Sequence, residues 1–353
     1  MRRLVATVLA SALAAAGSHA AAPTERTFFH KDWQLACDNT GACRAAGYER
    51  EDERDGNAVS VVFTREAGPG TKIAGELQLG DMDDRAPHPG SVHLSIAGKA
   101  VGAIDLDGET NHAWLQPRIV AALLEALTGT GAIVFTDDDS HAWTLSGDGA
   151  SAVLLKMDDL QGRVGTPSAI VRKGAASEAG VPPPVAMPVV HAASVPTMHE
   201  PGDDALSLKI IASIAETDDC DLLHDRGPMG QPVDVATPLW HLDGVRVLVT
   251  APCWRGGYNS GDGYWVANAK PPYDPKLVTA SGTDFDAKVG ITSQEKGRGV
   301  ADCLGNDTWT WDGHQFVHTQ ETTSGMCRGV MLGGAWDLPT IVTKVLPAGP
   351  ETK

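Results

Sequence analysis

Six cysteines constrain the fold of this chain more strongly than any other feature of its sequence. They stand at Cys37, Cys43, Cys220, Cys253, Cys303 and Cys327. An even number of cysteines in an exported chain is typical of a disulfide framework, although the sequence alone does not choose among the many pairings. We expect neighbours to pair, which gives Cys37–Cys43, Cys220–Cys253 and Cys303–Cys327. No Cys-x-x-Cys motif and no Cys–His cluster with zinc spacing occurs, which argues against a metal site and against thioredoxin-like chemistry.

The first twenty residues have the order of a secretory signal peptide. Arg2 and Arg3 precede an apolar run at 4–16, and the small residues Ser18 and Ala20 provide a cleavage site. The run is too short to span a bilayer, and no later stretch reaches the roughly 18 apolar residues that spanning requires. We therefore predict cleavage after Ala20, a periplasmic or secreted mature protein, and no membrane insertion.

The charge balance excludes two classes of partner. The chain has 45 acidic and 28 basic residues, for a formal net charge of −17. Nucleic acids and anionic membrane surfaces are bound through basic footprints. We therefore expect neither of them as a partner.

A proline-rich stretch at 173–203 divides the mature chain. It includes Pro182-Pro183-Pro184, and proline fixes φ and removes a backbone donor, so the stretch is neither helix nor central strand. It is either a free spacer or an extended arm that lies on a domain. We predict an N-terminal domain over 21–172, this linker or arm, and a C-terminal domain over 204–350.

The hydrophobic patterns predict an α+β fold that is mainly antiparallel β with a few segregated helices, in two domains. In the N-terminal domain, short β-branched and aromatic stretches predict strands up to residue 106, two more at 132–136 and 142–145, and a last strand at Ala169–Arg172. Helical spacing appears at 119–127 and at 153–160. Asp148 is the expected cap of the second helix.

The C-terminal domain is predicted to be a β-meander that follows one helix. The helix is expected over Ala205–Ala215, with Asp203 or Asp204 as its cap. Short strand-like segments fill the remainder, and Asp312-Gly313 between two of them is a strong signal for a two-residue hairpin turn.

Searches for known catalytic motifs find none. The segment 257–261 lacks the central serine of a nucleophile elbow, and no phosphate loop or dinucleotide fingerprint occurs, so we expect no cofactor. The acidic groups at 81–84, 105–109 and 137–139 are interpreted as turns, because none has the ligand pattern of a calcium loop. A pair of carboxylates for glycoside hydrolysis stays open, since two such residues can meet from anywhere in the chain.

The most distinctive cluster joins three arginines to glycines, cysteines and aromatic residues. It consists of Trp254, Arg255, Tyr258, Arg298 and Arg328. One interpretation is a cationic pocket, fixed by disulfides and walled by the two aromatic residues, for an anionic group. The other is that the arginines form ion pairs with local aspartates at 262, 302 and 307, as structural arginines often do.

Tryptophan is concentrated after residue 203. The six in that part are Trp240, Trp254, Trp265, Trp309, Trp311 and Trp336. Exposed tryptophans would indicate a face that binds carbohydrate or protein, whereas buried ones fill a core, and burial is the expectation.

The arginine cluster and several other stretches of the chain resemble a secreted proteobacterial family of unknown function. The resemblance is carried by Trp-x3-Cys-Asp-Asn-Thr-x2-Cys-Arg-Ala-Ala-Gly-Tyr at 33–48 and by the stretches 161–166, 253–259, 296–303, 311–319 and 327–339. The first half is also loosely similar to the invasion-associated locus B proteins. The resemblance implies an envelope or periplasmic location and no known catalytic residues.

The leading hypothesis is a periplasmic, disulfide-stapled binding or interaction module that is not an enzyme. Its expected partner is an envelope protein or an anionic small molecule. Two alternatives stay open: a secreted carboxylate-dependent hydrolase of envelope glycan, and an inhibitor of a cationic hydrolase that the negative charge would attract.

Overall fold

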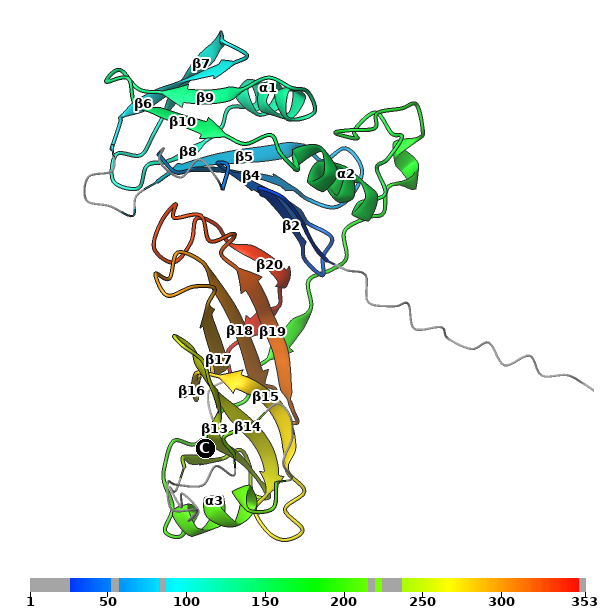
Figure 1. Ribbon diagram of the computed structural model, residues 1–353. Helices are drawn as coiled ribbons and strands as arrows, with labels where there is room; N and C mark the ends of the chain where they lie inside the picture. Colours follow the sequence, from blue (N-terminus) through cyan, green and yellow to red (C-terminus); the bar gives the residue numbers. More distant parts are fainter. Residues whose placement is uncertain are drawn as a thin grey trace, which may run out of the picture.

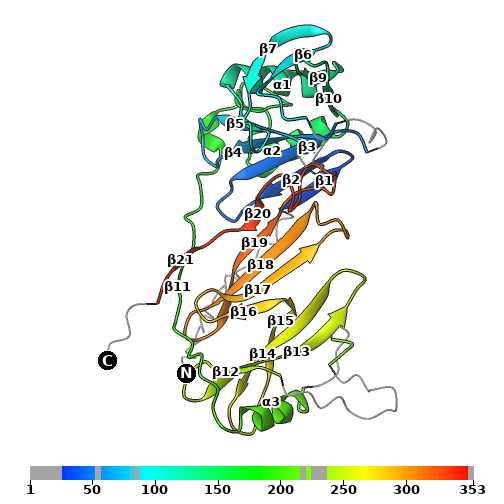
Figure 2. The same ribbon diagram turned by 90° about the vertical axis from the view of Figure 1, so that its left-hand side faces the viewer.

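The computed structural model describes residues 26–51, 57–80, 82, 87–214, 220–223 and 237–348. The predicted signal peptide and the aspartates at 81, 83 and 84 lie outside the described residues. The described elements are mostly antiparallel strands with three α-helices, which agrees with the predicted α+β class. Figures 1 and 2 show the sheets following one another along an elongated molecule.

The first sheet contains six antiparallel strands, and its alternating side chains face two different environments. Val59, Val61 and Phe63 of one strand are fully buried in the main core, whereas Ser60 and Val62 between them point to the other face. In spatial order the strands are β1 (Thr27–His30), β2 (Trp33–Cys37), β3 (Cys43–Tyr48), β4 (Val59–Arg65), β5 (Ile73–Leu79) and β8 (His112–Trp114).

A second sheet and two helices complete the N-terminal core. The sheet has the order β10 (Ala142–Leu145), β9 (Ile133–Thr136), β6 (Ser91–Ile96) and β7 (Lys99–Asp105). Helix α1 (Pro117–Leu127) begins with a proline at its first turn, where no backbone donor is needed, and buries Ile119 and Leu123. Helix α2 (Ala150–Leu160) packs against β1, β2 and β3. Together these elements enclose one continuous apolar core.

Both predicted helix caps after residue 145 are wrong, because glycines in left-handed backbone occupy those positions. Gly149 precedes α2 with φ 95°, and a β-carbon there would lie 1.9 Å from the carbonyl oxygen of His30. Only glycine permits that approach. Helix α3 (Asp203–Ile211) likewise follows Gly202 at φ 101°. The aspartates expected as caps therefore do not cap either helix.

The predicted strand at Ala169–Arg172 is also wrong, because a buried carboxylate takes the hydrogen bonds that a strand would need. Asp158 of α2 accepts hydrogen bonds from the backbone N–H groups of Ile170 (2.7 Å) and Val171 (3.1 Å). Its other oxygen accepts one from Arg65 Nη2 at 2.8 Å, and both side chains of this ion pair are buried. Arg65 Nε also donates to Gln161 at 2.6 Å. A polar network therefore replaces the expected strand.

Two further antiparallel sheets follow in the C-terminal half, each a simple meander. The first is β12 (Leu239–His241), β13 (Arg246–Arg255), β14 (Ser260–Asn268) and β15 (Lys276–Gly282). The second is β16 (Asp284–Asp286), β17 (Gly290–Lys296), β18 (Leu304–Trp311), β19 (Phe316–Thr323) and β20 (Leu338–Ile341). One apolar cluster joins α3 to β13 and β14, and another lies where the two sheets meet.

The proline-rich stretch is an arm that lies on the rest of the molecule. Its strand β11 (Val189–His191) pairs in parallel with β21 (Lys344–Leu346) near the end of the chain. The backbone N–H of Val185 donates to Thr40, and that of Ala193 donates to Trp311, so the arm contacts both halves. Figure 2 shows the arm running down one side of the molecule beside β21. The spacer alternative is therefore not what the structure contains.

The six cysteines form three disulfides, and each joins neighbours in the sequence: Cys37–Cys43, Cys220–Cys253 and Cys303–Cys327. Each bond closes a loop within one half of the chain, so none of the three links the two halves covalently.

Candidate functional site

The structure holds two of the predicted site residues together beside the Cys303–Cys327 disulfide. Tyr258 Oη, on a half-exposed side chain, donates a hydrogen bond to the carbonyl of Gly297 at 3.1 Å. Arg298 follows directly and forms a two-pronged ion pair with Asp302. Burial raises the pKa of Asp302, but hydrogen bonds from Arg298 and from the Gly329 N–H outweigh it, and the pKa lies below its ordinary value. The charge of Arg298 is therefore balanced inside the protein.

The remaining predicted site residues have other contacts. Arg328 is buried, and its Nη2 donates to Asp32 of the N-terminal half at 2.9 Å. Trp254 Nε1 donates to Ser281 at 3.2 Å, and Arg255 is exposed at the end of β13. Arg298 and Arg328 form ion pairs with different main partners, Asp302 and Asp32, although both also interact with the Glu51 carboxylate. Arg298 has the local partner of the ion-pair interpretation, whereas the partner of Arg328 is distant in sequence.

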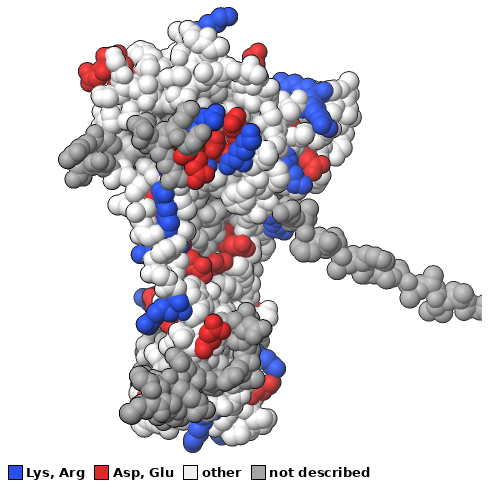
Figure 3. All heavy atoms as spheres, viewed as in Figure 1, with Lys and Arg blue, Asp and Glu red and all other residues white. Residues whose placement is uncertain are grey.

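The pair Arg328–Asp32 belongs to a junction between the first sheet and the C-terminal loop that leads to β20. The backbone N–H of Met326 donates to the buried Tyr48 hydroxyl at 3.1 Å, and Trp336 Nε1 donates to Ser60 at 2.7 Å. A small apolar cluster fills the space between them. The loop thus covers part of the outer face of the first sheet. Figure 3 shows acidic and basic side chains interspersed on the face that is viewed in Figure 1, with wide areas that carry neither.

The part of the sheet that this loop leaves open is a groove with a volume of about 630 Å³, which we call the junction groove. It is lined by residues of β3, β4, β5, β8 and the loop: Arg44, Val62, Thr64, Glu76, Gln78, Thr110, His112, Met331, Gly334, Ala335, Trp336 and Asp337. Strand alternation explains its polarity. Leu77 and Ala113 are buried on the inner face, so their neighbours on β5 and β8 point outward.

A row of aromatic and carboxylate side chains runs from the groove to Trp114, which stands just beyond the lining residues on the same face of the sheet. Glu76 is the direct cross-strand partner of Trp114, and Gln78 is that of His112. His112 Nε2 lies 3.1 Å from a Glu76 carboxylate oxygen, with both side chains about three-quarters buried or more. Two indoles lie edge-on to the His112 imidazole. The ring centroids are 5.9 Å apart for Trp114 and 6.3 Å apart for Trp336. Trp114 is 70% exposed, a large apolar ring held in water next to hydrogen-bonding groups.

Only part of this groove has a recognisable signal in the sequence. Alternation of Glu76 and Gln78 with two buried leucines indicates a strand with one polar outer face, but not what that face does. The three-residue strand that carries His112 and Trp114 was not predicted, and Trp336 was interpreted as core. Of the six tryptophans expected to be buried, Trp265 and Trp311 are buried, whereas the others are only partly buried: Trp240, Trp254, Trp309 and Trp336.

Three groups of side chains in the described residues have metal-ligand types close together. One contains Asp302 with the disulfide-bonded Cys303 and Cys327, which offer no thiolate. Another lies at Asp137, Asp139 and His141, where Asp137 accepts the hydrogen bonds of a tight turn, as the turn interpretation expected. The third consists of Asp307, His318 and Glu321 on the neighbouring strands β18 and β19.

Comparison with known proteins finds a family and a distant relative, whereas no solved structure matches. The chain is similar over 346 residues to the uncharacterized protein YpfG of Escherichia coli strain K12, at 26% identity, covering 91% of this chain and 93% of that protein. The model of the DUF1176 family, described as a protein of unknown function, matches residues 27–343. Because the match extends from β1 almost to β21, the chain belongs to the DUF1176 family.

Proposed function

We propose that this protein is a binding module outside the cytoplasm that holds a carbohydrate chain in the junction groove. The observation that carries the proposal is the 70% exposure of Trp114 beside Glu76 and His112. A pyranose ring has an apolar C–H face that stacks on an indole and a rim of hydroxyl groups that donate to carboxylates. The groove offers both kinds of contact within one row of the sheet.

The groove is also held in a fixed shape, which favours binding. Ser60 holds the Trp336 indole, and a hydrogen bond from the Thr322 hydroxyl holds Asp337. Groups that are already ordered lose little conformational entropy when a ligand arrives. A neutral polar chain also suits the site, since Arg44 is already paired with Asp38 at 3.1 Å.

The proposed location rests on the three disulfides, which persist in oxidising compartments. No described helix is both long and apolar enough to cross a membrane. In the envelope, the accessible polymers with the required chemistry are glycans. We therefore take a β-1,4-linked N-acetylglucosamine tetramer and purified peptidoglycan sacculi as the probes.

The substitution Trp114→Ala is expected to weaken binding of the tetramer by about tenfold, the effect of losing one stacking platform. The measurement is calorimetric titration, together with cosedimentation with sacculi. Phe29→Ala is the matched control, because Phe29 is an aromatic residue of similar exposure (57%) on the edge strand β1. Equal affinities of both variants and the wild type would remove the groove as the site.

A second candidate function is hydrolysis of the bound glycan, which is favoured by the presence of two carboxylates, Glu76 and Asp337, in one groove. If the protein is a hydrolase, the wild type releases reducing ends, and Glu76→Gln lowers that rate by about 100-fold or more while the tetramer still binds. Asp337→Asn should act in the same way. A wild type that binds the tetramer and releases no reducing ends is a binding module alone.

A further inference from the structure

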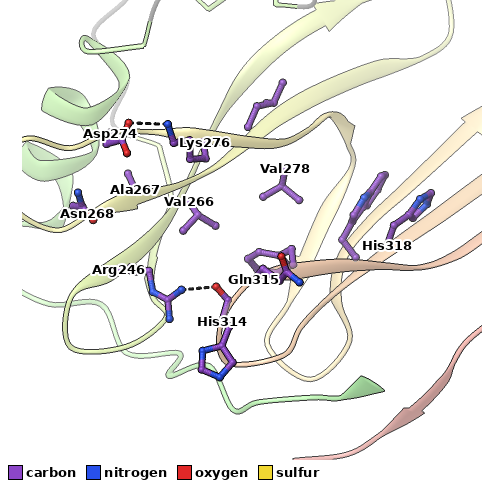
Figure 4. A pocket seen from close by; sticks show the side chains of 13 residues that line it. Arg246, Val266, Ala267, Asn268, Asp274, Lys276, Val278, His314, Gln315 and His318 are labelled. Carbon is purple, nitrogen blue, oxygen red and sulfur yellow. Dashed lines mark hydrogen bonds and ion pairs between the residues drawn. The ribbon is translucent and has the colours of Figure 1, made fainter. Parts of the chain in front are cut away.

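A second cavity opens where the two C-terminal sheets meet. It shares no lining residue with the junction groove. Its volume is about 530 Å³, within the range of small-molecule sites. We call it the intersheet cavity, and Figure 4 shows its labelled side chains. It is lined by Arg246, Val266, Ala267, Asn268, Asp274, Lys276, Leu277, Val278, Trp309, His314, Gln315, Phe316 and His318.

The floor of the intersheet cavity is apolar. Val266 and Val278 come from β14 and β15, and Phe316 comes from β19. All three pack against the cluster that joins the two sheets, so the cavity is the open end of that core. Figure 4 shows Val266 and Val278 in the middle of the site, between the two groups of polar residues. An apolar ligand body in this place would leave water, which stabilises it by about 0.8 kcal/mol for each buried methylene.

The rim carries two basic groups, each of which is paired with a carboxylate. Arg246 is fixed over the Trp311 ring at 4.8 Å, forms an ion pair with Asp243 and donates to the carbonyls of Gly313 and His314. Lys276 is mostly exposed and lies 2.9 Å from Asp274, which is the one carboxylate among the lining residues. An ion pair in water contributes little to stability, so Lys276 can exchange this partner for a ligand carboxylate at small cost.

From this arrangement we infer that the intersheet cavity binds a small amphipathic carboxylate, with its apolar chain on Val266, Val278 and Phe316 and its anionic head at Lys276. Lys276 supplies the positive charge for the head group when it leaves Asp274, and the floor selects the apolar body. The chain has a net charge of −17, so a ligand anion has little attraction to the protein elsewhere. Because Arg246 stays paired with Asp243, the preference for an anion depends on Lys276.

Octanoate is the probe, with octylamine as the same chain of opposite charge and octanol as the uncharged one. Calorimetric titration of the full mature protein is expected to give octanoate an affinity at least about tenfold above that of octylamine. Lys276→Glu should remove that preference and leave octanol binding unchanged. Equal affinities for octanoate and octylamine, or no octanoate binding at millimolar concentration, would overturn the inference.

The location is tested by filling the floor. Val278→Trp is expected to abolish octanoate binding, whereas Val185→Trp on the exposed part of the arm should leave it intact. Thermal melting of each variant shows whether it is folded, and Lys276→Glu keeps the test decisive if Val278→Trp does not fold. Retention of octanoate binding by a folded Val278→Trp protein would place the ligand elsewhere. Neither result depends on whether the junction groove binds sugars.

Discussion

Replacing Arg65 with methionine is expected to lower the free energy of unfolding by about 3–5 kcal/mol. Arg65 is 1% exposed, and its partner Asp158 is fully buried. The substitution would leave a buried carboxylate without its cation, although the N–H groups of Ile170 and Val171 would still donate to it. Removing one member of a buried pair costs far more than the pair contributes, because the charge that stays behind has lost its water.

Urea denaturation followed by tryptophan fluorescence measures this loss. Arg118→Met is the matched control, since Arg118 is an exposed arginine on α1 whose side chain bonds to Gln116. We expect it to change the free energy of unfolding by no more than about 0.5 kcal/mol. If Arg65→Met falls within about 1 kcal/mol of the wild type, the buried pair is not what fixes α2 to the first sheet.

Removing the Cys303–Cys327 disulfide by a double alanine substitution is expected to cost about 3 kcal/mol. The bond joins residues 24 apart and stands at the base of the loop that covers the first sheet. The same change at Cys37 and Cys43, which are 6 apart, should cost about 1 kcal/mol less, because the shorter loop restricts the unfolded chain less.

The loss at Cys303 and Cys327 should also be local. Hydrogen exchange is expected to speed up at the backbone N–H groups of Met326 and Trp336, which bond across or within the junction. Tetramer binding in the junction groove should weaken in parallel if the proposed function is right. A variant that loses stability evenly over the chain, with unchanged exchange at these two positions, would contradict the view that this disulfide fixes the junction.

Most of the strands could be predicted because their side chains alternate. Val59 to Thr64 and Ser91 to Ile96 have the pattern of a sheet with two different faces, and both segments are strands in the structure. The disulfides also joined the neighbours that the sequence indicated. Local sequence patterns were therefore sufficient to predict the α+β class and the disulfide pairing. The division into two independent domains stays a prediction.

The features that were predicted wrongly or not at all depend on contacts between residues far apart in the sequence. The end of α2 and the segment at 169–172 are organised by Arg65, which is 93 residues before its partner Asp158. One interpretation gave Arg328 a local aspartate as its partner, but its hydrogen-bond partner Asp32 is 296 residues away. The strand β8 has three residues, too few to show a period, and it carries two groups of the candidate site. Contacts between distant segments leave no spacing that a sequence pattern can reveal.

The parallel pairing of β11 with β21 has a consequence for the order in which this protein folds. The partner of the arm lies at 344–346, and the loop that covers the first sheet lies at 324–341. The N-terminal core can form without either of them, since all of its strands precede residue 146. The outer face of the first sheet and the arm are covered only when these last segments join the fold. Truncation near the C-terminus would therefore expose surfaces in the opposite half of the chain.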